Sequence, residues 1–226
     1  MKIHGMTVCV NYADLLEKSI GRWMSGLESM TVVTDDRDLD TFDLCMRHGV
    51  HAVITDSFYR DGAAFNKGRA QQFAWPLIPK DDWILLFDAD ITPPEGWETI
   101  LEEQTLAPGF LYGAHRYDEH GVRLPDDTHG YGYFQLFHGQ DHLAQINPFF
   151  DTFWTHAGNA DSFIMLRWRN EGRLAPALPL ELIHPGGPSH NWYGRGKEKE
   201  WERMQQERMR RGGGWPSIEG EKITLK

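Results

Sequence analysis

The sequence predicts an α/β fold in which a mainly parallel sheet is flanked by helices and is followed by an irregular C-terminal half. Over the first 105 residues, short β-prone runs alternate with helical apolar stripes, and strands that alternate with helices form parallel sheets through right-handed crossovers. The run at residues 83–87 is apolar throughout, as expected of a strand that is covered on both faces. With 226 residues and 40% hydrophobic content, the chain is long enough to form one large domain.

The first strand is predicted at residues 7–10, and a helix follows it. Leu16, Ile20, Trp23 and Leu27 recur at spacings of four, three and four, which places them on one helical face. A second strand at residues 30–34 precedes a helix that carries four apolar residues and ends at a glycine, namely Leu39, Phe42, Cys45, Met46 and Gly49. These two strand and helix units begin the alternation.

A third strand is predicted at residues 50–54, and Asn66 is a suitable N-cap for the helix after it. Residues 83–87 then form the fourth strand. Beyond about Leu106 the alternation breaks down, although residues 134–137 resemble a further strand and a helix is expected to begin near Asp161. A charged helix is predicted over residues 198–211, and no internal repeat is evident.

The formal net charge of −10 argues against general affinity for nucleic acid, because such affinity depends on neutralisation of phosphates by Lys and Arg. Residues 195–211 are an exception, with seven basic residues against four Glu. This segment is either a solvated helix face or a contact for an anionic partner.

No stretch approaches the ~18 consecutive apolar residues that would span a membrane, and the N-terminal residues lack the apolar core of a signal peptide. We therefore expect a soluble, cytoplasmic protein with no membrane span. Cys9 lies in a predicted strand and Cys45 in a predicted helix, so both are expected to be buried thiols without a chemical role.

Asp88-Ala89-Asp90 follows the predicted buried strand directly. Open α/β sheets bind ligands at the carboxyl ends of their strands, and residues i and i+2 of an extended segment project the same way. Both carboxylates can then reach one hard cation such as Mg²⁺ or Mn²⁺. Alternatively, these aspartates cap the next helix, but residues 92–95 already have the T-x-x-E form of a capping box.

The order of these features resembles the GT-A fold glycosyltransferases, in particular the family 2-type enzymes that use nucleotide sugars. The segments that carry the resemblance are Val10-Asn11-Tyr12, Thr34-Asp35-Asp36, Gly62-Ala63-Ala64-Phe65-Asn66-Lys67-Gly68 and Asp88-Ala89-Asp90. The third segment is similar to the family's A-R-N-x-G pattern, with Phe65 where Arg is usual. Lys67 or Arg69 is then the candidate for the missing positive charge.

The resemblance implies a GT-A (Rossmann-like) fold and a role for each segment. Asn11, Tyr12, Asp35 and Asp36 correspond to contacts with the nucleoside, whereas Asn66, Lys67 and Asp88 lie at the diphosphate. Asp88 and Asp90 match the D-x-D motif that holds Mn²⁺ or Mg²⁺ between the two phosphates of a nucleoside-diphosphate sugar. For Asp35 and Asp36, capping of the second helix is an equal alternative.

A later acidic residue acts as general base in the same family, and residues 158–163 with Arg167 loosely resemble its E-D-x-D-F…R segment. Asp161 is the only acid there, so it is the candidate base that takes the acceptor proton during direct displacement. Capping of the helix by Asp161 is the alternative. The sequence leaves inversion and retention open.

The segment His184-Pro185-Gly186-Gly187-Pro188-Ser189-His190 resembles the C-terminal loop that supplies a third metal ligand in many of these enzymes. His184 is the first candidate and His190 the second, because imidazole binds Mn²⁺ acceptably. Arg195 follows this loop directly and is a candidate contact for the donor. Surface exposure is the alternative for either histidine.

The leading hypothesis is a metal-dependent glycosyltransferase that moves a sugar from a nucleoside-diphosphate sugar to an acceptor hydroxyl. Residues 1–105 form the half that binds the donor, and residues 106–226 form the acceptor half, with the metal-binding loop and the charged helix. The acceptor is a glycan, a small molecule or a polyanion such as modified DNA. Alternatives are a nucleotidyltransferase that acts on sugar phosphates and a non-catalytic glycan-binding module. The chain lacks the Gly-rich basic loop that nucleotidyltransferases carry after the first strand.

Overall fold

A computed structural model describes residues 1–124, 132–153, 157 and 160–185. The strands in these residues are β1 (Ile3–Val8), β2 (Ser29–Thr34), β3 (His51–Ile54), β4 (Trp83–Asp88), β5 (Ala114–Tyr117), β6 (Phe134–His138) and β7 (Leu178–Ile183). The α-helices are α1 (Ala13–Gly26), α2 (Leu39–His48), α3 (Lys67–Ala74), α4 (Trp97–Glu102) and α5 (Ala160–Asn170). Short 3₁₀ turns are η1 (Arg60–Gly62), η2 (Trp75–Leu77) and η3 (His142–Gln145).

The main sheet has five strands in the order β3-β2-β1-β4-β6, and β5 pairs with β7 in a second, two-stranded sheet. All pairs are parallel except that of β4 with β6. Val8 pairs with both Val33 and Asp88, so β1, β2 and β4 end at the same edge of the sheet, which we call the carboxyl edge. The prediction of an α/β fold with a mainly parallel sheet is confirmed.

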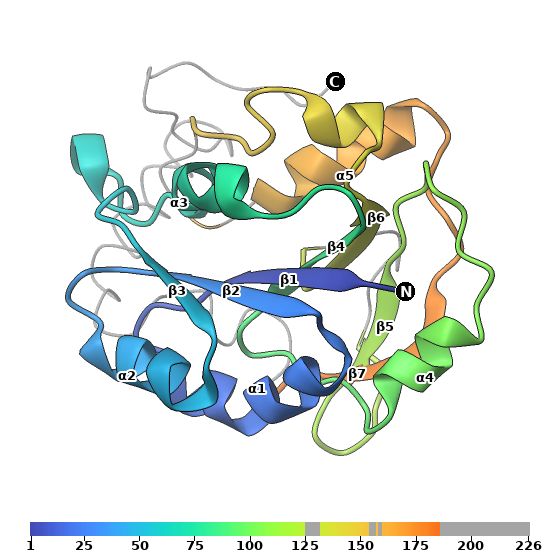
Figure 1. The fold of residues 1–226 in the computed structure, drawn as a ribbon, viewed down its shortest axis with the longest axis horizontal. Helices are drawn as coiled ribbons and strands as arrows, with labels where there is room; N and C mark the ends of the chain where they lie inside the picture. The colour runs from blue at the N-terminus through green and yellow to red at the C-terminus, as the bar shows by residue number, and fades with distance from the viewer. Residues whose placement is uncertain (125–131, 154–156, 158–159, 186–226) are drawn as a thin grey trace.

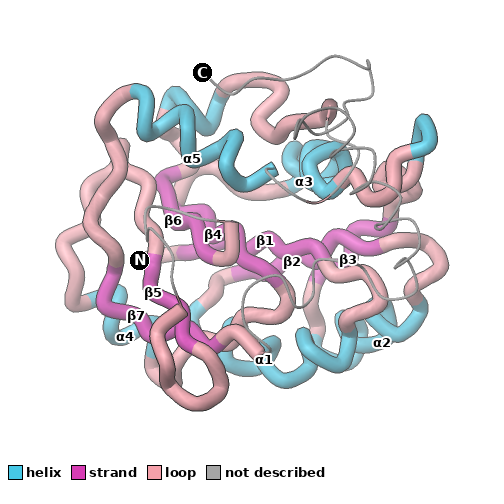
Figure 2. Tube along the Cα trace, turned by 180° about the vertical axis from the view of Figure 1, so that it is seen from behind, coloured by secondary structure: helices cyan, strands magenta, loops and turns pink. Residues whose placement is uncertain are grey.

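Helices cover both faces of the main sheet. The two views show α1, α2 and α4 on one face and α3 and α5 on the other (Figures 1 and 2). A separate group of buried side chains fills each interface. Trp23 and Trp97 are fully buried on the side of α1 and α4, where their ring centroids lie 5.2 Å apart. This double cover explains why β4 is apolar from Trp83 to Phe87, up to its terminal Asp88.

The core under α3 and α5 contains a run of aromatic rings among aliphatic side chains. Trp75 stacks on Phe149 with 4.3 Å between centroids, Phe149 lies 5.5 Å from Phe137, and Phe137 lies 5.1 Å from Trp168. These four residues form a continuous series of contacts, the aromatic row, from the end of α3 to the last turns of α5. Offset and tilted rings at these distances attract one another in addition to burying apolar area.

Most predicted element boundaries agree with the structure to within a few residues. The first strand begins at Ile3, four residues before the predicted start, and the added part includes the buried polar residue His4. Helix α2 ends at Gly49, which has the expected left-handed backbone (φ 65°). The Asn66 side chain accepts a hydrogen bond from the Arg69 N–H at 2.8 Å, so the predicted cap of α3 is confirmed.

The predicted capping box at residues 92–95 is wrong. Helix α4 begins only at Trp97, after Gly96 with φ 71°. The Thr92 N–H and carbonyl instead pair with the backbone of Ile183 at the end of β7, at 2.9 Å in both directions. Backbone pairing with a strand 91 positions later therefore holds this segment in a bridge, which the local sequence pattern does not reveal.

Both cysteines are free and buried, as predicted. Burial raises the pKa of the Cys9 thiol to about 12 and that of Cys45 to about 11. Neither thiol is therefore a nucleophile near neutral pH. Among the residues that the structure describes, none belongs to a helix long and apolar enough to cross a membrane.

Candidate active site

A buried lysine joins two of the predicted acidic residues at the carboxyl edge. Lys67, the first residue of α3, places its Nζ 2.7 Å from Asp88 Oδ1 and 3.0 Å from Asp161 Oδ1. The Lys67 side chain is only 10% exposed. Asp88 ends β4, and Asp161 lies in the first turn of α5. Three elements thus bring the candidate diphosphate contact, the candidate metal ligand and the candidate base together.

Charge and burial act in opposite directions on these groups. Burial favours the protonated form of Asp88 and raises its pKa. The Lys67 ammonium lowers this pKa, whereas the neighbouring carboxylates of Asp161 and Asp90 raise it further. Together these effects place the pKa of Asp88 at about 6. For Lys67, burial alone would lower the pKa, but the two carboxylates outweigh it and raise the pKa. Lys67 is accordingly a permanent cation within the site.

Asp90 and His184 form a second pair next to the first. His184 Nε2 lies 3.2 Å from Asp90 Oδ2, and both side chains are largely buried. The other ring nitrogen, Nδ1, lies 3.2 Å from Arg116 Nη1 of β5. The Arg116 guanidinium also lies over the ring of Tyr133, 4.5 Å from its centroid. His184 directly follows β7, so the parallel pairing of β5 with β7 places Arg116 beside it.

The segments predicted to contact the nucleoside lie at the ends of β1 and β2. The Asn11 N–H donates to Asp38 Oδ2 at 2.6 Å, and Asn11 has a positive φ of 62°, which Asn tolerates better than most residues. Asp38 also accepts from the Thr41 N–H at 3.1 Å and is the N-cap of α2. The alternative that Asp35 or Asp36 caps α2 is therefore wrong.

Asp35 is buried and is bound by a nearby arginine. Arg37 donates to the Asp35 carboxylate from Nε at 2.6 Å, from Nη2 at 3.2 Å and from its backbone N–H at 3.1 Å. Burial would raise the pKa of Asp35, but these hydrogen bonds outweigh it and hold the pKa below its usual value. Asp36 is exposed, 3.7 Å from Arg37 Nε. The Arg37 guanidinium also lies 4.9 Å from the ring centroid of Tyr59.

Tyr12 immediately precedes α1, and its carbonyl accepts the N–H groups of Leu15 and Leu16. Asn66 is fully buried: besides capping α3, its Nδ2 donates to the Thr152 carbonyl at 2.9 Å. These contacts make Asn66 a structural anchor for the residue that follows it, Lys67. Arg69, the other candidate for the missing positive charge, instead pairs with the exposed Asp61 at 3.0 Å.

Two glycines permit close approaches that position the site. A Cβ added to Gly68 would lie 1.8 Å from the backbone carbonyl oxygen of Asp151, so α3 touches residues 149–153 with no room for a side chain. A Cβ added to Gly132 would lie 1.7 Å from Cγ of Asp161. Gly132 precedes β6 at the carboxyl edge, and Gln135 of β6 donates from Nε2 to the Asp161 carbonyl at 3.0 Å.

Asp88, Asp90 and His184 together have the donor chemistry of a Mn²⁺ or Mg²⁺ site, since carboxylate oxygens suit both ions and imidazole suits Mn²⁺. The donors lie in two pairs rather than around one point, because Asp88 faces Lys67 whereas Asp90 faces His184. In the described part of the chain, the triplet with ligand atoms all within 4.8 Å of one another is His4, Asp81 and Asp82.

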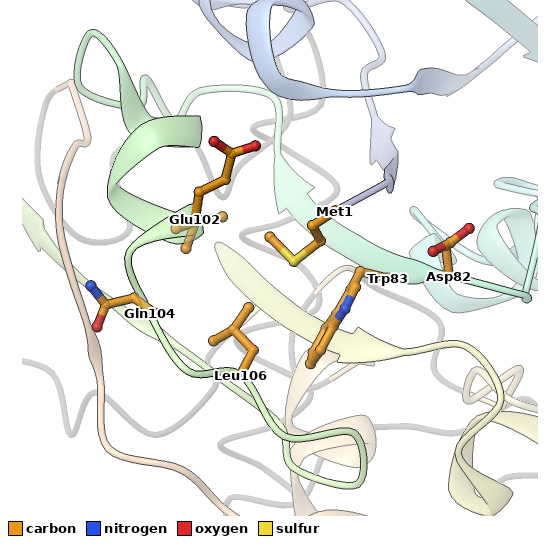
Figure 3. A pocket seen from close by; sticks show the side chains of 7 residues that line it. Met1, Asp82, Trp83, Glu102, Gln104 and Leu106 are labelled. Atoms are coloured by element: carbon orange, nitrogen blue, oxygen red, sulfur yellow. The ribbon is translucent and has the colours of Figure 1, made fainter.

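This second acidic group lies at the opposite edge of the sheet. Asp82 precedes β4 and Asp88 ends it, so about 20 Å of strand separates them. A cavity of about 320 Å³ opens beside Asp82, where the side chains of Met1, Trp83 and Leu106 face the same hollow (Figure 3). The residues that line it include none of the candidate site residues.

Two predicted site residues, His190 and Arg195, and the predicted charged helix at residues 198–211 lie outside the described residues. Conversely, the structure places four residues at the site that the sequence analysis did not select: Arg37, Asp38, Arg116 and Gly132. For Asp38, the pattern of an Asp immediately before an apolar helical stripe was a usable signal. An isolated Arg116 in a short strand carries no such signal.

No protein-family model matches the chain, and no curated protein matches it in sequence. Solved structures do share its fold. The structure of GalNAc-T7 with UDP, GalNAc and Mn²⁺ has a TM-score of 0.57 at 11% identity, over 84% of this chain and 44% of that one. Mannosyl-3-phosphoglycerate synthase from Rubrobacter xylanophilus has a TM-score of 0.55 at 14% identity, over 94% of this chain and 75% of that one.

A nucleotidyltransferase also shares the fold. The inositol-1-phosphate CTP transferase from T. maritima has a TM-score of 0.52 at 10% identity, over 87% of this chain and 96% of that one. Identities this low show the fold alone. This chain therefore has a GT-A-like α/β fold, whose structural neighbours include both glycosyltransferases and nucleotidyltransferases.

Proposed function

We propose that the chain is a metal-dependent glycosyltransferase that moves a sugar from a nucleoside-diphosphate sugar to an acceptor hydroxyl. The observation that supports this most strongly is the bridge formed by Lys67, whose ammonium contacts both Asp88 and Asp161. It brings the D-x-D aspartate, a cation suited to a diphosphate and a carboxylate suited to proton transfer into one small region at the carboxyl edge. Each of these is needed where a glycosidic bond to a diphosphate breaks.

In this mechanism Asp88 and Asp90 would hold Mn²⁺ or Mg²⁺, with His184 as the first choice of third ligand and His190 as the second. The ion would supply neutralisation of the charge that builds on the leaving diphosphate. Lys67 adds a second, fixed positive charge at the same place. Asn11, Tyr12, Asp35 and Asp36 are assigned to the nucleoside, and Arg195 is assigned to the donor by its place in the sequence after residues 184–190.

Asp161 is assigned the role of general base, which accepts the proton of the acceptor hydroxyl as the new glycosidic bond forms. Its backbone and side chain are both held, by Gln135 and by Lys67 respectively. With Asp161 as the one base, the acceptor oxygen displaces the diphosphate directly, and the configuration at the anomeric carbon is inverted. The acceptor is a glycan, a small molecule or a polyanion. Because residues 195–211 are rich in basic side chains, anionic acceptors are the first to assay.

The competing proposal is a nucleotidyltransferase, which the fold of the CTP transferase supports. The segment Asn11-Tyr12-Ala13-Asp14 argues against it, because it has none of the glycines and basic residues that bind a triphosphate after the first strand. A non-catalytic glycan-binding module would bind glycans without nucleotide or metal. Incubation with nucleoside triphosphates and sugar phosphates, followed by assay of released pyrophosphate, tests the nucleotidyltransferase directly.

The decisive measurement for the proposed function is the binding of a panel of nucleoside diphosphates, each with and without Mn²⁺. At least one should bind more tightly with Mn²⁺, and Asp90→Asn should reduce that metal-dependent gain by at least about tenfold, because it weakens a metal ligand without changing side-chain volume. Asp56→Asn, which alters an exposed carboxylate paired with Arg60, is the control and should retain the gain. Metal-independent binding throughout would rule the proposal out.

A further inference from the structure

The Lys67 ammonium occupies the position from which a metal ion would reach Asp88. It lies 2.7 Å from Asp88 Oδ1, whereas a bound Mn²⁺ or Mg²⁺ would lie about 2.1 Å from a carboxylate oxygen of the same residue. The two cations would then be within roughly 5 Å of each other at a partly buried position, where solvent screens their repulsion only in part. Lys67 is 10% exposed and is held in place by Asp161 as well.

The arrangement of the ligands is consistent with this competition. Asp88 faces Lys67, while Asp90 pairs with His184 Nε2 at 3.2 Å. In the described residues, Asp88, Asp90 and His184 do not bring their ligand atoms within 4.8 Å of one another, although His4, Asp81 and Asp82 do. The three candidate metal ligands are thus not gathered around one point. Asp88 contacts Lys67 instead of lying with Asp90 and His184.

We infer that Lys67 makes metal binding conditional on the donor: its ammonium excludes a divalent cation until a diphosphate is present to neutralise both positive charges. This inference rests on the proposed function and specifies the order of binding at the same site. A diphosphate brings enough negative charge to hold the ammonium and the metal ion together. Metal and diphosphate then bind cooperatively, and the coupling is reciprocal, because each ligand raises the affinity of the other by the same factor.

The test measures the affinity for Mn²⁺ in the absence of diphosphate, by electron paramagnetic resonance of free Mn²⁺. The reference protein carries Asp82→Asn alone, so that the group of His4, Asp81 and Asp82 does not add a bound ion, and every variant is made in this reference protein. The first comparison is between the reference protein and Lys67→Met. Lys67→Met should bind Mn²⁺ at least about tenfold more tightly. In a second measurement without metal, its affinity for inorganic pyrophosphate should fall by a similar factor.

Two further variants distinguish competition between Lys67 and Mn²⁺ at Asp88 from a general effect of the net charge of the protein. Arg69→Met removes the same charge from the same helix, but its partner is Asp61, so its affinity for Mn²⁺ should not change. The double variant with Lys67→Met and Asp161→Asn restores the original net charge and leaves no unpaired Asp161, yet it still removes the ammonium from Asp88. This double variant should also bind Mn²⁺ more tightly than the reference protein. It keeps the test valid if Lys67→Met alone is unstable because it leaves a buried charge unpaired.

Equal Mn²⁺ affinities in Lys67→Met, Arg69→Met and the reference protein would overturn the inference, as would tight binding of Mn²⁺ alone by the reference protein. These outcomes are independent of the proposed reaction, because no sugar nucleotide or acceptor is used. A protein that gains Mn²⁺ affinity on loss of Lys67 but binds no nucleoside diphosphate would support the exclusion of the metal ion by Lys67 and refute both its release by a donor and the glycosyltransferase.

Discussion

Asp161→Asn is expected to lower turnover by about 10²- to 10⁴-fold while leaving the affinity for the donor nearly unchanged. The substitution keeps the shape of the side chain but removes the carboxylate that is proposed to accept the proton of the acceptor hydroxyl. Lys67 retains Asp88 as its partner, at 2.7 Å, so the diphosphate end of the site keeps its cation. Turnover is measured under saturating donor, and donor affinity is measured separately by calorimetry.

The matched control is Asp61→Asn, because Asp61 also forms an ion pair with a basic residue of α3, at 3.0 Å, but at an exposed position away from Asp88. It should keep normal turnover. Gly132→Ala provides a second route to the same loss, since its new Cβ would overlap the Asp161 carboxyl group and displace it. If Asp161→Asn retains turnover, Asp161 only orients Lys67, and a mechanism without this base must operate.

Gly68→Ala is expected to destabilise the protein by on the order of 2 kcal/mol or more and to lower the Tm by roughly 5 to 10 °C. Its Cβ would lie 1.8 Å from the carbonyl oxygen of Asp151, and a backbone atom cannot move aside as a flexible side chain can. The neighbouring contacts resist separation too, because Gln72 Oε1 accepts the N–H groups of Phe149 and Phe150 at 2.8 and 2.9 Å.

The control for this prediction is Gly21→Ala in the interior of α1, where an added Cβ meets no atom within 4 Å. That change should stabilise the protein by about 0.5 to 1 kcal/mol, because Ala loses less backbone entropy in a helix. Thermal unfolding of both variants therefore gives shifts of opposite sign. A Gly68→Ala variant as stable as the parent would mean that α3 does not pack against residues 149–153 this closely.

The sequence predicts the local elements of this fold well because they depend on short-range patterns. Apolar periodicity locates β4, the left-handed Gly49 ends α2, and Asn66 caps α3 as expected. The errors occur where distant segments pair. Thr92 resembles a helix cap, but its backbone is paired with Ile183, and no local pattern records a partner so far along the chain.

The same distinction applies to the candidate site. The sequence identifies Asp88, Asp90, Asp161 and His184 one by one, but it does not show which of them are in contact. Lys67 appears there as a possible substitute for an arginine at the diphosphate, whereas the structure pairs it with two carboxylates 21 and 94 positions away. Such contacts depend on how α3, β4 and α5 are placed by the core, which is a property of the whole fold.

The aromatic row gives this placement a mechanical basis. Lys67 begins α3 and Asp161 begins α5, while Trp75, Phe149, Phe137 and Trp168 fill the space beneath these helices without interruption. Close-packed interiors resist changes of volume, so the rings of this row contribute to the placement of the two helices. The ion pair of Lys67 with Asp161 joins the first residues of these helices, so it depends in part on the core packing beneath them. Replacement of the buried Phe137 by a smaller residue is therefore expected to weaken the contact of Lys67 with Asp161, although Phe137 belongs to the core and not to the candidate site.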